Sequence, residues 1–360
     1  MEQDTRLKFG GIEAARGIAA VLVALYHGSR LVAQPRYAGV VPAAGMFGDF
    51  DKGVDFFFVL SGFLITWVHW HDMGLPSRLP HYLRRRFIRI YPVYWLALLI
   101  PLAGSALHVR ETALPLTSGI VISSIFLLPG DQPMVLGVAW TLVYEVLFYC
   151  AFACAILAGR RAAACAAALW ASLIVAASTL GVSAPFPFSF LASPFILEFL
   201  MGVAAAILLR RAAVSSPRAL AIGGAAVFVL FMLTRIDRFV GMGELGPRLF
   251  FGSCAAVFVA GSVEWERSGR ASVPRWLGLL GGASYSIYLI HSTVQPIIMR
   301  IIWSHIRTVS PLIITVGLAC AGTLAGIVFH LTVEKPVIGY TRRILGASGR
   351  GAHSREGDRA

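Results

Sequence analysis

Charged side chains are scarce in this chain. Asp, Glu, Lys and Arg make up 14% of its 360 residues, whereas a soluble domain averages about 25%. Acidic residues are the smaller part, with 18 against 31 basic ones, and 57% of the residues are hydrophobic. This composition, with a mean hydropathy of +0.74, excludes an ordinary soluble domain and predicts an integral membrane protein. In that class the net charge of +13 indicates basic cytoplasmic loops and not a nucleic-acid partner.

The sequence also lacks a metal-ligand pattern and a long polar stretch. Its five cysteines lie in or beside apolar runs without paired spacing, which favours packing roles and predicts no metal site. The longest polar stretch is 346–360, which we expect to be a disordered cytoplasmic tail. Residues 1–345 are therefore expected to form a single transmembrane domain.

Ten apolar runs are long enough, at about 20 residues, to cross a hydrocarbon core of about 30 Å. They are 12–32, 53–70, 87–107, 138–158, 162–180, 194–209, 219–234, 247–263, 277–302 and 311–331. The expected fold is an all-α polytopic bundle of about ten transmembrane helices, with 118–128 as a short half-buried helix. If the N-terminus is cytoplasmic, the cytoplasmic loops hold about twice as many Arg and Lys as the opposite ones, which predicts that both termini are cytoplasmic.

The first span carries three ionisable residues, Glu13, Arg16 and His27. Such residues are expensive in lipid and are functional candidates by default. Arg16 and His27 are eleven residues apart, which is close to three helical turns, so both face the same way about 16 Å apart along the axis. One helix face is thus expected to present a cation toward the cytoplasm and a titratable imidazole toward the outer side.

Four further residues from three other spans fall in the outer half of the membrane under this topology: Asp55, Tyr144, Glu145 and Glu198. Each alone could be an interfacial residue, but a polar substrate cavity shared with His27 explains all of them. A carboxylate beside His27, from Glu145 or Asp55, would fix the tautomer of the imidazole and raise its basicity.

The cytoplasmic side has a cationic character. Arg86 and Arg89 are three residues apart and share a helix face, at the same depth as Arg16. Their guanidinium groups suit phosphate oxygens, although a plain anchor for lipid headgroups is the alternative. In the ninth span Tyr285, Tyr288 and His291 recur at a spacing of three, so they either line the cavity or form a packing stripe.

Seven segments occur in the order known from one family. They are Glu13–His27, Gly53-Val-Asp-Phe-Phe-Phe-Val-Leu-Ser-Gly-Phe-Leu-Ile65, Arg85-Arg-Phe-Ile-Arg-Ile-Tyr-Pro92, Trp140-Thr-Leu-Val-Tyr-Glu-Val-Leu-Phe-Tyr149, Glu198-Phe-Leu-Met-Gly202, Ser284-Tyr-Ser-Ile-Tyr-Leu-Ile-His291 and Glu334-Lys-Pro336. In this order the chain resembles the type 3 membrane acyltransferases, which O-acylate bacterial surface carbohydrates. Glu13 stands where the family usually has Asp. The Tyr144-Glu145 pair is more similar to exopolysaccharide acetyl- and succinyltransferases than to O-antigen enzymes.

The resemblance implies a bacterial inner (plasma) membrane enzyme. It implies cytoplasmic acyl-CoA, with acetyl-CoA favoured, as donor and a hydroxyl of a cell-surface or lipid-linked carbohydrate as acceptor. It also implies that Arg16 and His27 are essential and that Arg86 and Arg89 matter. His27 is then either a general base or a nucleophile that is acylated first. A transporter or flippase of a glycolipid or polysaccharide is the alternative, although the sequence lacks the internal repeat common in transporters.

Overall fold

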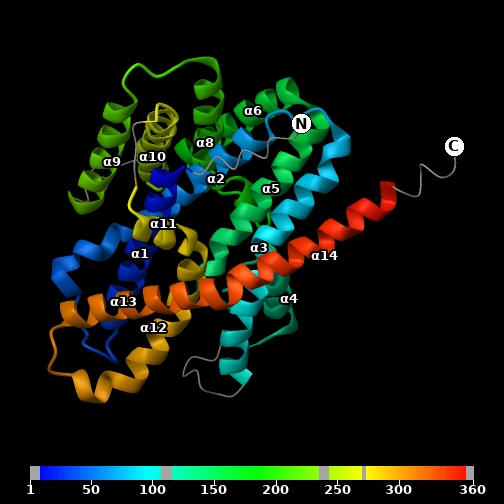
Figure 1. Cartoon of the computed structure of the whole chain (residues 1–360). Helices are drawn as coiled ribbons and strands as arrows, with labels where there is room; N and C mark the ends of the chain where they lie inside the picture. The colour runs from blue at the N-terminus through cyan, green and yellow to red at the C-terminus, as the bar shows by residue number, and fades with distance from the viewer. Residues whose placement is uncertain (1–8, 107–115, 235–242, 270–272, 354–360) are drawn as a thin grey trace.

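The computed structural model describes residues 9–106, 116–234, 243–269 and 273–353, and every regular element in these ranges is helical (Figure 1). The long helices are α1 (Gly10–Val32), α2 (Gly53–His69), α3 (Leu79–Ala106), α5 (Trp140–Ala158), α6 (Arg160–Thr179), α8 (Phe195–Arg211), α9 (Pro217–Thr234), α10 (Leu245–Arg267), α12 (Ser284–Ile306), α13 (Pro311–Phe329) and α14 (Lys335–His353). The shorter ones are α4 (Ser118–Phe126), α7 (Phe188–Leu191) and α11 (Arg275–Gly282). The predicted all-α membrane bundle is confirmed.

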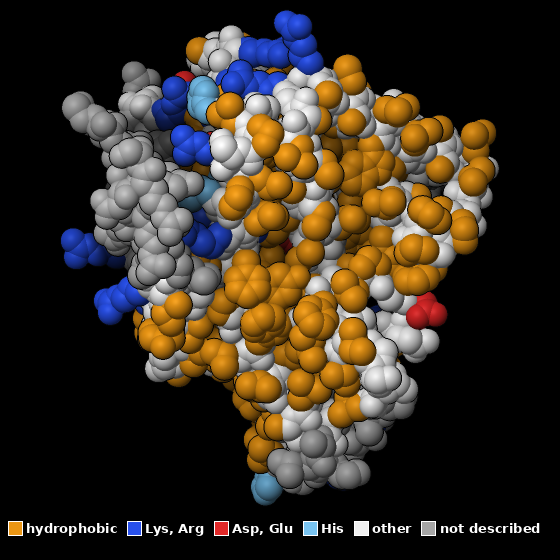
Figure 2. Space-filling model, turned by 90° about the vertical axis from the view of Figure 1, so that its right-hand side faces the viewer, with side chains coloured by type: hydrophobic (Ala, Val, Ile, Leu, Met, Phe, Trp, Pro, Cys, Tyr) orange, Lys and Arg blue, Asp and Glu red, His pale blue; other side chains and the backbone are white. Residues whose placement is uncertain are grey.

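The helices follow the predicted apolar runs closely. In the described residues, eight helical segments are long and apolar enough to cross a membrane. Both α1 and α12 fall outside that set because they carry polar residues, yet each has 23 residues and is about 35 Å long. Figure 2 shows a face covered largely by hydrophobic side chains, with Lys and Arg gathered along its upper and left edges. The number of crossings and the side of the termini stay predictions.

One predicted span is two helices. The run 277–302 was expected to be a single span, but α11 ends at Gly282 and α12 begins at Ser284. The break lets α11 lie directly on α1: a Cβ atom at Gly281 would overlap the backbone of Glu13, and one at Gly17 would come within 2.8 Å of the Gly281 nitrogen. The glycines therefore set the path of the chain before α12.

The other end of the chain also differs from the expected boundary. A π-helical turn over His330–Glu334 joins α13 to α14, and the two helices form the long rod that crosses the lower part of Figure 1. Helix α14 continues to His353, past residue 346 where we expected a disordered tail to begin. Residues 354–360 lie outside the described part.

Helix α1 is the centre of the bundle, because it contacts α2, α10, α11, α12 and α13. Its residues Ala20, Val23 and Ala24 are completely buried. The N-terminus of α1 is held from α10, where the Glu266 carboxylate accepts a hydrogen bond of 2.6 Å from the Gly11 amide. A carboxylate suits the unpaired amides and the positive dipole end of a helix. Arg16 and His27 thus lie on a helix that is packed on several sides and held at its N-terminus.

Glycines bring further helices into close contact. Helices α2 and α8 cross at Gly62 and Gly202, where an added Cβ would overlap the carbonyl oxygens of Phe199 and Val59, respectively. Helices α9 and α10 meet at Gly224, whose Cβ would lie 2.7 Å from the Phe258 nitrogen. Close backbone approach at small residues is how helices pack in lipid, where apolar burial between helices gives little gain.

Candidate active site

Two histidines meet near the middle of the bundle. Nδ1 of His291 lies 2.9 Å from the carbonyl oxygen of Ile287, and Nε2 of His291 lies 3.3 Å from Nδ1 of His27. Nδ1 of His27 is also 3.0 Å from the carbonyl oxygen of Val23. A carbonyl oxygen only accepts, so each Nδ1 carries the hydrogen, and in the neutral pair each Nε2 is the acceptor.

This tautomer assignment has a chemical consequence. Nε2 of His291 faces the Nδ1–H of His27, and Nε2 of His27 keeps a free lone pair. His291 is completely buried, whereas His27 is only partly buried. The atom of His27 that is available for base or nucleophile chemistry is therefore Nε2. When Nε2 takes up a proton, Val23 and His291 hold the opposite side of the ring.

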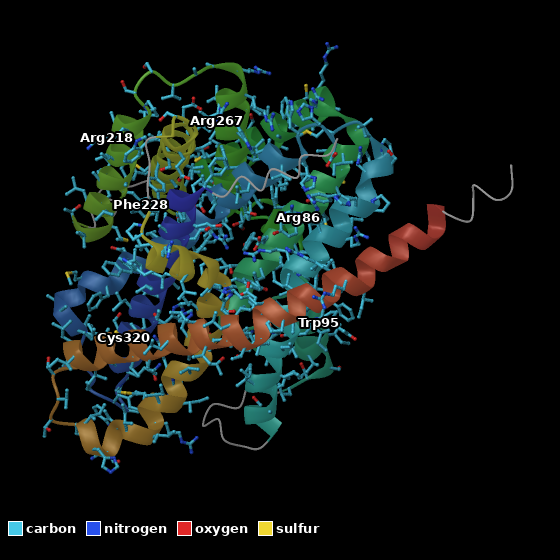
Figure 3. All side chains as sticks on the ribbon, in the orientation of Figure 1. Arg86, Trp95, Arg218, Phe228, Arg267 and Cys320 are labelled. Carbon is cyan, nitrogen blue, oxygen red and sulfur yellow. The ribbon has the colours of Figure 1, made fainter. Side chains whose placement is uncertain are left out.

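A cavity of about 180 Å³ lies on the cytoplasmic side of this pair, as the predicted topology orients the bundle. Three arginines line it, Arg16 from α1 and Arg86 and Arg89 from α3. In the view of Figure 3, Arg86 lies on α3 well inside the outline of the molecule, whereas Arg218 and Arg267 lie toward one end. Arg16 and the pair on α3, which the sequence placed at one depth, thus line one cavity. Three guanidinium groups give the cavity a chemistry that suits an anion.

Each α3 arginine is held by further side chains. Arg89 lies 3.6 Å from the Glu334 carboxylate and 5.3 Å from the ring centre of Tyr285. The other oxygen of Glu334 accepts from Ser286 at 2.7 Å and lies 2.7 Å from Nδ1 of His330. The π-helical turn carries both Glu334 and His330, and such turns are frequent at functional sites. Glu334, the first residue of the last family-like segment, is buried and holds Arg89.

Glu145 lies in the arginine cavity and not beside His27. Its carboxylate accepts a short hydrogen bond from the Tyr149 hydroxyl and lies 3.5 Å from the Ser61 hydroxyl. The expected pairing of Glu145 with His27 is thus not formed. Position along the sequence does not give the direction in which α5 turns this face.

Asp55 and Glu198 form a second polar cluster with an arginine that sequence reasoning missed. Arg248 of α10 lies 2.6 Å from the Asp55 carboxylate and 3.8 Å from that of Glu198, and its guanidinium lies 4.1 Å from the ring centre of Phe195. Both carboxylates are buried. Asp55 therefore forms an ion pair with Arg248 and does not orient His27. Two acidic residues inside apolar runs need a counter-charge when they are buried. That need was the signal in the sequence that could have pointed to Arg248.

Tyr144 belongs to an aromatic group beside that cluster. Its ring packs against Trp140, Phe190 and Phe195 at centroid distances of 5.3–6.1 Å. It does not line the arginine cavity, although its neighbour Glu145 does. Of the predicted substrate-cavity residues, Tyr144 and Glu198 thus lie together on one side, and Tyr285 and His291 on another.

Tyr288 connects the cavity with the histidine pair. Its ring lines the cavity and its centroid lies 5.9 Å from that of His291. Its hydroxyl lies 2.9 Å from the Thr141 hydroxyl and 3.2 Å from the Val138 carbonyl oxygen. Of the three residues at a spacing of three on α12, Tyr285 and Tyr288 thus line the cavity, whereas His291 contacts His27 and does not line it.

The described part of the chain contains no group of three or more His, Cys, Asp and Glu side chains that could hold a metal ion. Fold and site together define a polytopic helical membrane protein with an internal cationic cavity and a histidine pair beside it. The chain belongs to the acyltransferase domain family, whose model matches residues 9–331. It is therefore a membrane acyltransferase.

One characterised relative is similar over nearly its full length. The exopolysaccharide production protein ExoZ of Rhizobium meliloti (strain 1021) is 32% identical over 321 residues, which cover 83% of this chain and 94% of ExoZ. No solved structure matches this chain. The family assignment thus rests on sequence similarity, and the geometry comes from the structure described above.

Proposed function

We propose that this protein transfers an acyl group, with acetyl favoured, from cytoplasmic acyl-CoA to a hydroxyl group of an exopolysaccharide or its lipid-linked precursor in the bacterial plasma membrane. The observation that carries the proposal is the cavity in which Arg16, Arg86 and Arg89 converge, next to a histidine pair. Fixed guanidinium groups suit the phosphates of coenzyme A. The exopolysaccharide acceptor is suggested by the name of the similar protein ExoZ.

The cavity would hold the donor from the cytoplasmic side. Arg16, Arg86 and Arg89 bind its phosphate groups, and the thioester end points toward Tyr288 and the histidine pair. Because α1 carries Arg16 and His27 on one face about 16 Å apart, an extended pantetheine arm fits between them. The remaining lining is mainly apolar, with Phe57, Phe58 and Leu64 among the lining residues, and suits the uncharged arm.

His27 supplies the base. Its Nε2 takes the proton of the acceptor hydroxyl while that oxygen attacks the thioester carbonyl carbon; the carbon–sulfur bond then breaks, and the thiolate of coenzyme A takes the proton from Nε2. The competing route forms an acyl bond to Nε2 first and passes the acyl group to the hydroxyl in a second step. Both routes use the same atom. We favour the direct route because it needs no second attack at a partly buried ring.

The decisive experiment is acyl-CoA turnover by the purified full-length protein in nanodiscs. Acetyl-, succinyl- and longer acyl-CoA are offered with and without glycan, beside His27→Ala, Arg16→Ala and, as a control on α12, the exposed His305→Ala. Turnover that both of the first two variants lose and His305→Ala keeps would support the proposal. No turnover with any donor would overturn it and favour the transporter alternative.

A mass shift on His27 after incubation with acetyl-CoA alone would identify the two-step route. In its absence, acetylated acceptor formed in a single turnover supports the direct one.

A further inference from the structure

A histidine–carboxylate pair, separate from the His27–His291 pair, lies at the end of α2, on the side that the predicted topology makes cytoplasmic. His69 is the last residue of α2 and is almost completely buried. Its Nδ1 lies 2.7 Å from the Asp72 carboxylate, and its Nε2 lies 3.0 Å from Nη2 of Arg86.

The direction of these hydrogen bonds is fixed by chemistry. A guanidinium group only donates, so Nε2 of His69 must be the acceptor and Nδ1 must carry the hydrogen. That hydrogen points to the Asp72 carboxylate, which only accepts when ionised. The chain of donors therefore runs from Arg86 through His69 to Asp72, with a neutral imidazole in the middle.

The imidazole separates the carboxylate from the cavity. Arg86 lines the cavity, whereas neither His69 nor Asp72 is among its lining residues. A direct ion pair would occupy the guanidinium and bring a negative charge toward an incoming phosphate. Here Asp72 acts through a neutral ring, so Arg86 is anchored while most of its positive charge stays available to an anion.

Two aromatic rings also contact the guanidinium group of Arg86. The guanidinium of Arg86 lies 5.6 Å from the ring centre of Tyr82 and 5.5 Å from that of Tyr149. The Tyr82 ring in turn packs edge-on against His69, with 5.0 Å between the centroids. Within the described residues, the buried Nε of Arg86 has no hydrogen-bond partner. One edge of the guanidinium is thus held by His69 and by the two aromatic rings.

We propose that His69 and Asp72 are positioning residues for the donor site: they hold Arg86 in the orientation that binds a phosphate group of the acyl-CoA donor. This inference rests on the proposed function for the identity of the ligand. It predicts that loss of His69 raises the KM for the donor without a matching loss of kcat, because His69 does not touch the reacting atoms.

The test compares His69→Leu, His69→Gln and His69→Asn with the exposed neighbour His71→Leu as control. With acetyl-CoA, His69→Leu is expected to raise the KM by about tenfold, the effect of losing one hydrogen bond to a charged group. Gln can still accept from Arg86 and should restore most of the KM, whereas the shorter Asn should not. The KM for S-acetylpantetheine, which has no phosphate, should stay unchanged in all of them.

A double mutant separates positioning from a general structural role. If His69 acts through Arg86, the double variant His69→Leu/Arg86→Ala should have the same donor KM as Arg86→Ala alone. Additive losses, or an equal rise of KM for S-acetylpantetheine, would overturn the inference. If His69→Leu does not fold, the contrast between Gln and Asn decides in its place.

Calorimetric binding of CoA to the parent protein distinguishes this proposal from the one on which it rests. Absence of both CoA binding and turnover in the parent would remove the proposed function itself. Binding in the parent that His69→Leu fully retains would overturn only the role of His69.

Discussion

Nε2 of His291 lies 3.3 Å from Nδ1 of His27, so a second histidine occupies the position that a carboxylate has in a Ser-His-Asp triad. A neutral imidazole stabilises a protonated partner less than a carboxylate does. It also adds no negative charge to a membrane interior, where an unpaired carboxylate would be costly. His27, as the proposed base, thus has a partner suited to a membrane interior.

Removal of His27 should cost more than removal of His291. With the base lost in His27→Ala, we expect kcat to fall by a factor on the order of 10²–10⁴. In His291→Leu the Val23 carbonyl still accepts the Nδ1 hydrogen, so a fall of about tenfold is expected. Steady-state kinetics with varied donor measure both, and the donor KM should change little. A His291→Leu variant with a raised donor KM and full kcat would contradict the assignment.

Glu334 should act on the donor through Arg89. In Glu334→Gln the ion pair of 3.6 Å is replaced by a neutral contact, while the amide oxygen can still accept from Ser286. We expect the donor KM to rise by about three- to tenfold, since one charge interaction of a partly exposed arginine is lost. The matched change is Glu264→Gln, which affects an exposed pair with Arg267 and should leave the donor KM as it is.

Two neighbouring glycines of α9 should respond in opposite ways to alanine. A Cβ at Gly224 would lie 2.7 Å from the Phe258 nitrogen, whereas a Cβ at Gly223 meets nothing within 4 Å. Gly224→Ala should separate α9 from α10 and destabilise by about 1–3 kcal/mol. Gly223→Ala should be neutral or stabilise by up to about 1 kcal/mol. Thermal unfolding in one detergent compares them, and equal melting temperatures would show that the helices do not meet there.

The carboxylate at the start of α1 should contribute to stability. Glu266→Ala removes the acceptor 2.6 Å from the Gly11 amide, and loss of such a cap costs about 0.5–2 kcal/mol. Glu264→Ala, two residues away on the same helix, removes only an exposed ion pair and should cost at most about 0.5 kcal/mol. The difference in melting temperature between the two variants measures the cap. Donor affinity should fall together with stability, because Arg16 lies about one and a half turns further along α1.

The sequence predicted helices better than it predicted contacts. Long apolar runs gave nearly every helix, because length and hydropathy are local properties of a membrane span. The spacing of Arg86 and Arg89 correctly gave a shared face, since three residues on a helix fix their relative direction. The break at Ala283 was missed because its cause lies in Gly17 of another helix, whose approach is visible only in three dimensions.

The sequence predicted least well which side chains of the site contact one another. Depth along a span placed Asp55, Glu145 and Glu198 near His27, but depth does not fix the rotation of each helix about its own axis. That rotation directs Asp55 and Glu198 toward Arg248 and Glu145 toward the arginine cavity. His69 and Arg86 are 17 residues apart across a turn, and no periodicity connects them.

The contacts of Tyr288 have a meaning for the cell as well as for the reaction. In the predicted topology the arginine cavity lies on the cytoplasmic side and the histidine pair lies further out, so a continuous water path between them would let protons cross the membrane. The ring of Tyr288, tied to Thr141 by its hydroxyl and packed near Phe57, stands across that route. With that topology, the side chain that adjoins both halves of the proposed reaction would also narrow the path by which ions could cross the bundle.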